Sequence, residues 1–440
     1  MKRSSYHIAK KFTLRVLKQK RGVALIASMM IMAALTILGL WAVTSSLIDN
    51  QITSNYRDHI QAFYNAEAGI EHAVNILKAS TTSLDDLLLG SDGVPNTSDD
   101  GILSLGPSIS FGSGAYEVRV KDNDDGDGDL FSDSDKMIVL ASRGRVNNSN
   151  AVKTIGVGIK PAYIFNMGIF ADERITISSN AKTDSYDSKL GVYGGSNIGS
   201  KGDVGTNGTS TSPAAVSLSS NAKIYGDAFI GEGGDPSSAI SLSSNAEITG
   251  EKTAINEPVE LPLMSAPSGL PSMGSISLSS NDQQIISGSG SYSSITLSSN
   301  SQLTIGGSGE VVISTGTLSL NSNTQLNVGS GVTSVTIFVS DSLSVSSNAK
   351  INSNTKDPTK MNIFGTDSLT NCSLSSNGGY FGTLYARNSD ITVSSNVEIH
   401  GALIANRITL NSNARIHYDE SLGRTGPSSG LMVSSWREEF

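Results

Sequence analysis

The chain has only one cysteine, Cys372, among its 440 residues. A single thiol excludes an intramolecular disulfide and any metal site that needs paired cysteines. The five histidines are scattered along the sequence without the spacing of a ligand set. Charged residues make up only 16% of the chain, and the net charge of −9 argues against nucleic-acid binding. These absences exclude a charged helical protein and the usual cysteine-rich metal domains.

A stretch without any charged residue runs from residue 22 to residue 48. A helix of this length spans roughly 40 Å, which exceeds the roughly 30 Å hydrocarbon core of a bilayer. Residues 1–22 form a basic leader with eight Lys and Arg and no acid, and such a flank stays on the cytoplasmic side. We therefore predict that residues 23–48 span the inner membrane and that the residues after this segment are exported.

The helical pattern continues beyond the apolar stretch. Residues 49–79 contain no proline and one glycine, and apolar residues recur every three or four positions from Ile60 to Leu77. We predict one long helix over residues 23–79. Its lower half is apolar on all sides, whereas its upper half is amphipathic and needs a globular partner.

The sequence at the start of the apolar stretch resembles the leader of type IV pilins. The segment Lys20-Arg21-Gly22-Val23-Ala24-Leu25-Ile26 is similar to their type III signal, and the helix after it is similar to the PilX N-terminal family of minor pilins. The motif shared with that family consists of Asn55, Arg57, Asp58, Gln61, Ala62, Phe63, Ala66, Glu67, Ala68 and Gly69. The resemblance implies that a prepilin peptidase cuts between Gly22 and Val23, that the new amino terminus is methylated, and that the helix packs with other major and minor pilins.

One position departs from the pilin pattern. Typical pilins carry Glu at the fifth mature position, and this chain has Ala27 there. Inside a helix bundle that Glu pairs with the new amino terminus of a neighbour, so its loss removes one partner of a charge pair. The resemblance implies that subunits without this Glu are minor, initiating or tip components.

Residues 80–160 change from a helical to an alternating pattern. Residues 116–120, 137–141 and 152–159 alternate apolar with polar side chains, which predicts three antiparallel strands in a β-meander. By the pilin resemblance, this small sheet covers the apolar stripe of the upper helix.

An acidic segment lies between the first two predicted strands. Its oxygen-bearing side chains are Asp122, Asn123, Asp124, Asp125, Asp127 and Asp129. Hard oxygen ligands with intervening glycines suit Ca²⁺, although Ser134 stands where an EF-hand loop has its bidentate Glu. A solvated hairpin tip explains the same composition equally well. We expect no obligatory cofactor, and Ca²⁺ is the ion that this segment, or a similar one at residues 91–101, would bind.

The remaining two thirds of the chain repeat one pattern, I-x-L-S-S-N. The repeated asparagines are Asn180, Asn221, Asn245, Asn281, Asn300, Asn323, Asn348, Asn377, Asn396 and Asn413. An I-x-L strand places two apolar residues on one face, and Ser and Asn favour the turn that follows. Because one coil cannot bury its own interior, we predict a parallel β-helix of about ten coils over residues 161–440, with the asparagines in an axial ladder. An antiparallel sandwich is the alternative.

Several segments interrupt or end the repeats. The proline-containing stretch 258–271 is expected to be a surface loop, and residues 418–422 and 436–440 are expected to cap the last coil. Cys372 occupies an inward apolar position of its repeat and is expected to be a packing residue. The repeat with this ending is similar to domains found behind PilX-type amino termini and, loosely, to bactofilin-like β-helices.

The predicted fold class is α+β and mainly β, with a long amino-terminal helix, a small pilin-like sheet and a β-helix. We expect no enzyme, because the repeat positions carry Ser, Asn, Thr and Gly rather than clustered carboxylates and bases. The favoured function is a minor pilin-like subunit that passes from the inner membrane into an extracellular type IV pilus. The alternatives are a minor pseudopilin of a type II secretion system, a tip adhesin that binds a surface, glycan or protein, and an anchored envelope protein with Gly22 uncut.

Overall fold

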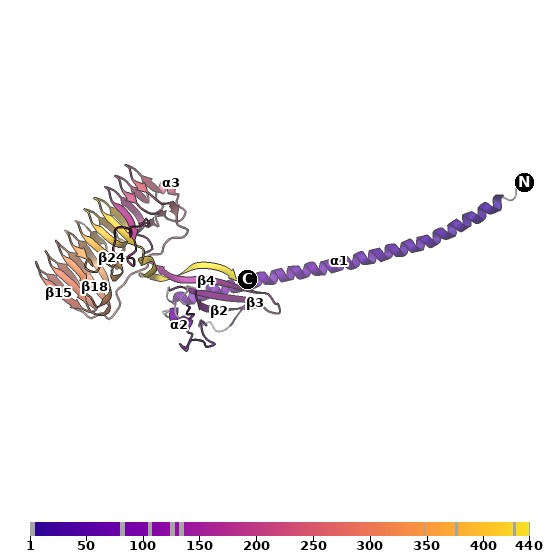
Figure 1. Ribbon diagram of the computed structural model, residues 1–440, viewed down its shortest axis with the longest axis horizontal. Helices are drawn as coiled ribbons and strands as arrows, with labels where there is room; N and C mark the ends of the chain where they lie inside the picture. Colours follow the sequence, from indigo (N-terminus) through magenta and orange to yellow (C-terminus); the bar gives the residue numbers. More distant parts are fainter. Residues whose placement is uncertain are drawn as a thin grey trace. The chain divides into compact units, whose positions relative to one another are not determined.

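The computed structural model describes residues 5–79, 84–103, 108–123, 128–131, 136–346, 348–374, 377–425 and 428–439. The chain forms two compact units (Figure 1). The first unit contains residues 1–160 together with 431–440, and the second contains Pro161–Gly430. A long amino-terminal helix followed by extensive sheets confirms the predicted α+β, mainly β class. The second unit ends near Gly430, however, and does not continue to residue 440 as predicted.

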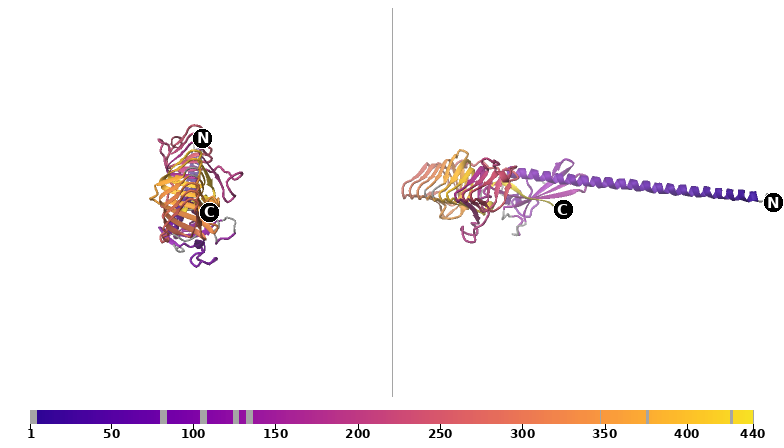
Figure 2. Two further views of the ribbon diagram at one scale, coloured as in Figure 1. Left: turned by 90° about the vertical axis from the view of Figure 1, so that its left-hand side faces the viewer. Right: turned by 90° about the horizontal axis from the view of Figure 1, so that it is seen from above.

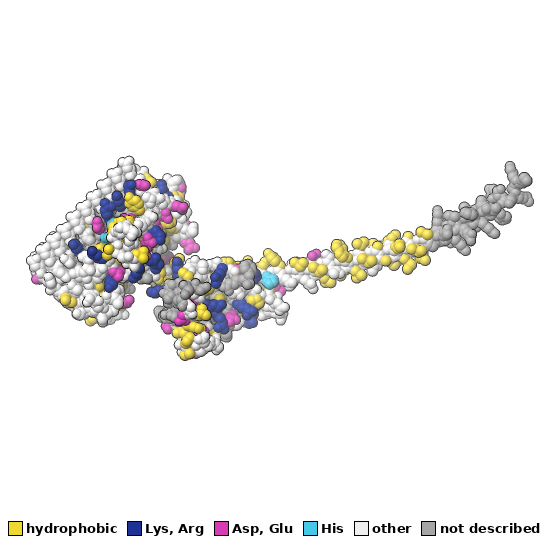
Figure 3. Space-filling view, viewed as in Figure 1, with side chains coloured by type: hydrophobic (Ala, Val, Ile, Leu, Met, Phe, Trp, Pro, Cys, Tyr) yellow, Lys and Arg dark blue, Asp and Glu magenta, His cyan; other side chains and the backbone are white. Residues whose placement is uncertain are grey.

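The first unit begins with helix α1 (Ser5–Ala79), which includes the predicted range 23–79 and continues into the leader. Large apolar side chains are exposed along its lower part, from Val23 to Ile52 (Figure 3). In its upper part the buried residues recur every three or four positions, which is the spacing of one helix face. These residues are Ala62, Ala66, Ile70, Ala73 and Leu77. A short helix, α2 (Leu84–Leu88), follows.

A five-stranded sheet covers the buried face of α1. Its order is β1-β2-β3-β4-β27, with antiparallel register from β1 to β4. The strands are β1 (Ile109–Phe111), β2 (Gly114–Asp122), β3 (Ile138–Val146), β4 (Val152–Tyr163) and β27 (Ser428–Glu439). The three predicted strands correspond to β2, β3 and β4. Apolar residues of these strands, among them Ile138, Leu140 and Ile155, form a buried core with Ala66 and Ile70.

Strand β27 corrects the prediction that residues 436–440 cap the last coil. It lies beside β4 in the sheet of the first unit, and Trp436 contacts Phe63 of α1 edge-to-face with ring centroids 5.9 Å apart. Without β27, β4 would present an open edge of unpaired backbone groups. The second unit is therefore an insertion between two neighbouring strands of the first unit's sheet.

The described residues of the second unit form 22 strands, which stack along the unit (Figure 2), and each of them pairs in parallel with a strand of a neighbouring turn. The strands are β5 (Ile169–Ile177), β6 (Lys182–Tyr186), β7 (Val204–Thr206), β8 (Val216–Leu218), β9 (Lys223–Ile224), β10 (Ala228–Ile230), β11 (Ile240–Leu242), β12 (Glu247–Ile248), β13 (Lys252–Ala254), β14 (Ser275–Leu278), β15 (Gln283–Ser287), β16 (Gly290–Leu297), β17 (Gln302–Gly306), β18 (Gly309–Leu320), β19 (Gln325–Val328), β20 (Val332–Val345), β21 (Lys350–Ile351), β22 (Met361–Gly365), β23 (Asn371–Leu374), β24 (Gly379–Val393), β25 (Glu398–Leu410) and β26 (Arg415–Asp419). Three short helices, α3 (Pro236–Ala239), η1 (Pro358–Lys360) and α4 (Leu422–Thr425), accompany them.

The register places like residues of the repeats over one another. Ile295 of β16 lies opposite Leu318 of β18, which in turn lies opposite Leu343 of β20. These inward residues form one continuous apolar core that runs through the unit. Each coil thus buries the open face of its neighbour, which a single coil cannot do for itself.

The spatial order of the coils differs from their order in the sequence. Strand β5, the first of the unit, lies between β25 and β8, so the chain enters inside the stack. It proceeds outward to β13, crosses through residues 255–274 to the opposite end, and returns from β14 to β26. In Figure 1 the yellow carboxyl-terminal coils accordingly lie beside the magenta ones. The segment 418–422 therefore caps no free end: Tyr418 and Asp419 pair with β6.

The repeated asparagines occupy one kind of turn. All ten have a positive φ between 57° and 66°, a conformation that Asn tolerates better than other side chains. Side-chain amides join neighbouring turns; for example, Asn323 donates to Asn300 at 3.0 Å and accepts from Asn348 at 3.0 Å. The same bond joins Asn413 to Asn396 and Asn396 to Asn377. The S-S-N sequence thus serves the turn and the stacking at once.

Substituting Asn323 separates these two contributions. Asn323→Ala removes the amide bonds and leaves a Cβ in the left-handed region, so we expect a loss of about 2 kcal/mol. Asn323→Gly removes the bonds but accepts the positive φ, so about 1 kcal/mol should be lost. Unfolding of the full chain in detergent, followed by the β-sheet circular dichroism signal, measures both. Equal stability of the two variants would show that the turn conformation carries no cost.

Candidate functional site: the amino-terminal helix and its contacts

The PilX-like motif lies on the part of α1 that meets the sheet of the first unit. Ala62 and Ala66 are fully buried against β3. At Gly144 of β3, a Cβ atom would lie 2.1 Å from the carbonyl oxygen of Ala62 and 2.4 Å from the amide nitrogen of Ala66. At Gly69 of the helix, a Cβ would lie 2.3 Å from the hydroxyl of Ser142. Small motif residues therefore let the helix backbone approach the sheet backbone.

Polar side chains fix this contact. The Gln61 amide donates to Asn65 at 2.9 Å, and the buried Asn65 amide donates to the backbone carbonyl of Arg145 at 2.8 Å. Two turns further, the ring of His72 shares a hydrogen bond with the Tyr116 hydroxyl at 2.7 Å. These bonds hold α1 in one register on the sheet, because a shift along the helix would leave Asn65 buried and unpaired.

The other motif residues differ in their exposure. Asn55, Arg57 and Glu67 are exposed, whereas Phe63 and Ala68 are partly buried beside the core. Arg57 lies 3.6 Å from the partly buried Asp58, and an exposed pair of this kind contributes little to stability. The motif thus divides into a face that docks the sheet and a face available to other molecules.

The predicted cleavage position lies within α1. Gly22 and Val23 are both helical, and Val23 is exposed, as are Leu25 and Ile26 after it. Among the described residues, α1 is the one helix long and apolar enough to cross a membrane, and none of its most apolar window is buried within the chain. An apolar surface of this length requires lipid or other helices around it.

The acidic segment of residues 122–129 is only partly described. Asp124, Asp125 and Asp127 lie outside the described residues. Asp122 and Asn123 line a cavity of about 380 Å³ together with Lys121 and Arg437. Asp129 is exposed and accepts a hydrogen bond from the backbone amide of Phe131 at 3.0 Å. Calcium binding by this segment stays a prediction.

The second acidic loop is held by its own hydrogen bonds. One carboxylate oxygen from each of Asp92, Asp99 and Asp100 lies within 4.8 Å of the other two. Asp99 accepts bonds from the Thr97 hydroxyl at 2.6 Å and the Ser91 hydroxyl at 2.7 Å. These bonds stabilise the carboxylate and lower the pKa of Asp99. Hydrogen bonds from uncharged hydroxyl groups therefore stabilise the closely spaced carboxylates of this loop.

Cys372 lies inside the second unit, as the repeat pattern indicates. It stands in register between Leu343 and Ile391 and is buried. Burial raises the pKa of its thiol to about 12, so the reactive thiolate is not formed at neutral pH. The residue is a packing group.

The structure corrects the view that the histidines are scattered. His400 and His417 lie opposite each other on adjacent coils, with Glu398 beside them. Sequence spacing alone missed this group because the two histidines are 17 residues apart, which is one coil rather than a familiar ligand interval. Both follow their repeat asparagine by four positions, and that shared offset is the signal that could have revealed them.

Part of each unit matches a known protein family. Residues 21–71 match the family described as PilX N-terminal, and residues 252–425 match a domain of unknown function, DUF7305. The crystal structure of the competence-associated pilin ComZ from Thermus thermophilus is similar at 11% sequence identity and a TM-score of 0.31. That alignment covers 87% of this chain and 97% of ComZ. No curated protein matches the sequence significantly.

The PilX match lies on the helix and motif described above, so the amino-terminal region of the chain is type IV pilin-like. The apolar amino-terminal helix indicates membrane anchoring. The resemblance of the repeats to bactofilins stays a prediction.

Proposed function

We propose that this protein is a minor structural subunit of a type IV pilus, which is cut after Gly22 and carries a parallel β-helix out of the filament. The observation that carries the proposal is the PilX-like α1, whose lower part is exposed and apolar and whose upper part is fixed to a small sheet. Such a helix exchanges lipid contact for packing among similar helices without refolding.

Assembly then follows a simple order. The basic leader holds the amino terminus in the cytoplasm, and a prepilin peptidase frees Val23, which is then methylated. The helix leaves the bilayer and joins the filament core, while Asn55, Arg57 and Glu67 on its exposed face meet neighbouring pilins. The second unit is inserted between β4 and β27 of the pilin sheet and does not interrupt α1. The second unit therefore enters the filament as part of the same subunit.

Ala27 supports a minor rather than a major role. A pilin without the carboxylate at this position cannot pair with the amino terminus of the subunit beside it. It also buries no charge when it enters the bundle, so it needs no such partner itself. A subunit of this kind suits a place at the start or tip of the filament, where one neighbour is missing.

Mass spectrometry of filaments sheared from the cell surface tests the proposal. We expect the amino-terminal peptide of this protein to begin at Val23 with one added methyl group, and to be much rarer than that of the major pilin. Calcium is expected to be dispensable for this processing, because the leader lies on the cytoplasmic side. If the protein occurs only in the inner membrane with residues 1–22 attached, it is an anchored envelope protein instead.

A further inference from the structure

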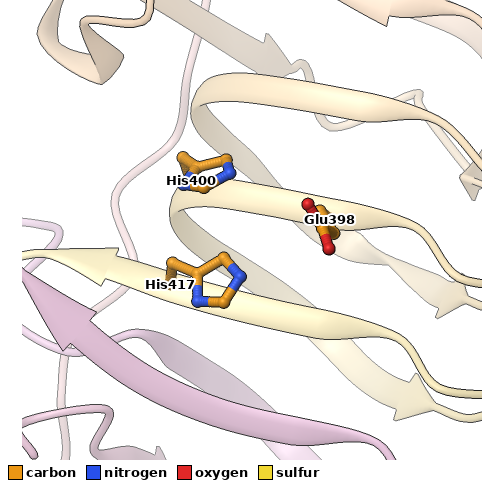
Figure 4. Close-up of side chains that lie close together, drawn as sticks. All are labelled: Glu398, His400 and His417. Atoms are coloured by element: carbon orange, nitrogen blue, oxygen red, sulfur yellow. The ribbon is translucent and has the colours of Figure 1, made fainter. Parts of the chain in front are cut away.

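Three side chains with metal-binding atoms gather on two adjacent coils of the second unit (Figure 4). Glu398 and His400 belong to β25, and His417 belongs to β26. His400 stands directly opposite His417 in the parallel register. One donor atom of each of the three residues lies within 4.8 Å of those of the other two. The group lies beside the junction where the returning chain meets β6.

Aromatic rings hold both imidazoles in place. His400 and His417 are 7% and 4% exposed, and their ring centroids are 4.7 Å apart. The ring of His400 stacks on Phe381, with centroids 4.2 Å apart and planes 3° apart. Tyr193 covers His417 at a centroid distance of 3.8 Å. Since the rings are already ordered, binding a ligand costs little side-chain entropy.

The hydrogen bonds prepare one nitrogen of His417 for a ligand. Its Nδ1 lies 2.5 Å from a carboxylate oxygen of Asp184, and the other oxygen of Asp184 accepts the Tyr193 hydroxyl at 2.7 Å. A carboxylate at Nδ1 keeps the proton there and leaves the lone pair of Nε2 free, as in metal sites where a carboxylate orients a histidine ligand.

His400 lacks a partner that a buried imidazole normally has. Its Nδ1 is buried and has no hydrogen-bond acceptor or donor among the described residues. A buried and unpaired imidazole next to a second one is costly unless it serves a ligand.

We propose that Glu398, His400 and His417 bind one divalent transition-metal ion of the Zn²⁺ type. Two imidazoles and one carboxylate are the ligands of zinc and its neighbours, whereas Ca²⁺ requires oxygen ligands. Ligand atoms around a tetrahedral zinc ion lie about 3.3 Å apart, so the side chains must close by about 1.5 Å at most. Glu398 is exposed and can make most of this movement. The ion would tie β25 to β26, and Asp184 acts as a positioning residue from β6.

Equilibrium binding of ZnCl₂ to the metal-free full-length chain in detergent tests this site. The protein is prepared without an affinity tag, and binding is measured by competition with a chromophoric chelator for Zn²⁺. We expect one Zn²⁺ per chain, with no competition from excess Ca²⁺. Glu398→Gln and His417→Gln should each weaken binding at least tenfold, and Asp184→Asn about tenfold. Glu310→Gln on β18 and His59→Gln on α1 are the matched controls and should bind as the unaltered chain does.

Bound Co²⁺ provides the spectroscopic check. We expect intense visible absorption, typical of a site with four or five ligands, which Zn²⁺ abolishes by displacement. Glu398 is a surface residue, so we expect the Glu398→Gln variant to fold even if a histidine variant does not. Circular dichroism verifies that each variant is folded. The proposal is overturned if the chain binds no Zn²⁺, or if Glu398→Gln and His417→Gln both bind as tightly as the controls. It does not depend on the role in a pilus.

Discussion

Replacing Gly144 by valine is expected to destabilise the first unit by about 3 kcal/mol or more. A side chain at this position cannot rotate away, because the Cβ itself would overlap the carbonyl oxygen of Ala62 at 2.1 Å. The obstructing atoms belong to the backbone of α1, so the helix must move off β3. That movement would break the bond from Asn65 to Arg145 and open the core around Ala66. Gly144→Ala should already show most of the effect.

The fluorescence of Trp436 reports this change. Trp436 lies on β27 against Phe63 of α1, so it senses the contact between helix and sheet. In a Trp41→Phe background it is the only tryptophan of the chain, since there are two in all. Gly379→Val on β24 is the control, because a Cβ there meets nothing within 4 Å. Denaturant midpoints that are the same for both variants would refute the close approach of α1 to β3.

The parts of the fold that were predictable are those set by local patterns. The three-to-four-residue spacing of apolar positions from Ile60 to Leu77 predicted the upper helix and its buried face. Alternation predicted β2, β3 and β4. The pairing of residues 436–439 with β4 was not predictable, because β4 lies far away in the sequence and no local pattern reveals which edge a strand will join.

The order of the coils was unpredictable for a different reason. Every repeat carries an apolar residue, a second one two positions later and an asparagine three positions after that, so one coil offers a similar inner surface to another. Where the returning chain meets the first coil, residues outside the repeat pattern form ion pairs across the junction. These pairs are Arg407 with Glu173, Lys201 with Glu420, and Arg424 with Asp187. Partly exposed pairs add little stability, but like charges would disfavour other stacking orders.

The candidate metal-binding group was also only partly predictable from the sequence. Phe381, His400, His417 and Asp184 each stand four residues after a repeated asparagine. Aligning the repeats would therefore have placed them at one position of the coil. Only the stacking order shows that Asp184, from the first coil, lies next to His417, from the last. The ligand pair was accessible from the sequence, whereas its supporting carboxylate was not.

Replacing Gly22 by valine is expected to abolish removal of the leader and, with it, incorporation into filaments. Gly22 lies inside the continuous helix α1, and a protease must unwind the chain to reach the bond after it. Glycine lowers the cost of that unwinding by about 1 kcal/mol relative to alanine and leaves the cut site without a side chain. Valine removes both properties, so full-length protein should accumulate in the inner membrane.

Gly39→Val is the matched control for this experiment. Gly39 lies in the same helix within the apolar stretch, where a Cβ meets nothing within 4 Å. The control should be shortened by the 22 residues of the leader and recovered in sheared filaments, as the unaltered chain is. Intact mass measurement of both variants decides the question. If the Gly22 variant is shortened like the control, Gly22 is not the cleavage determinant, and the helix must reach the filament by a route that needs no processing at this bond.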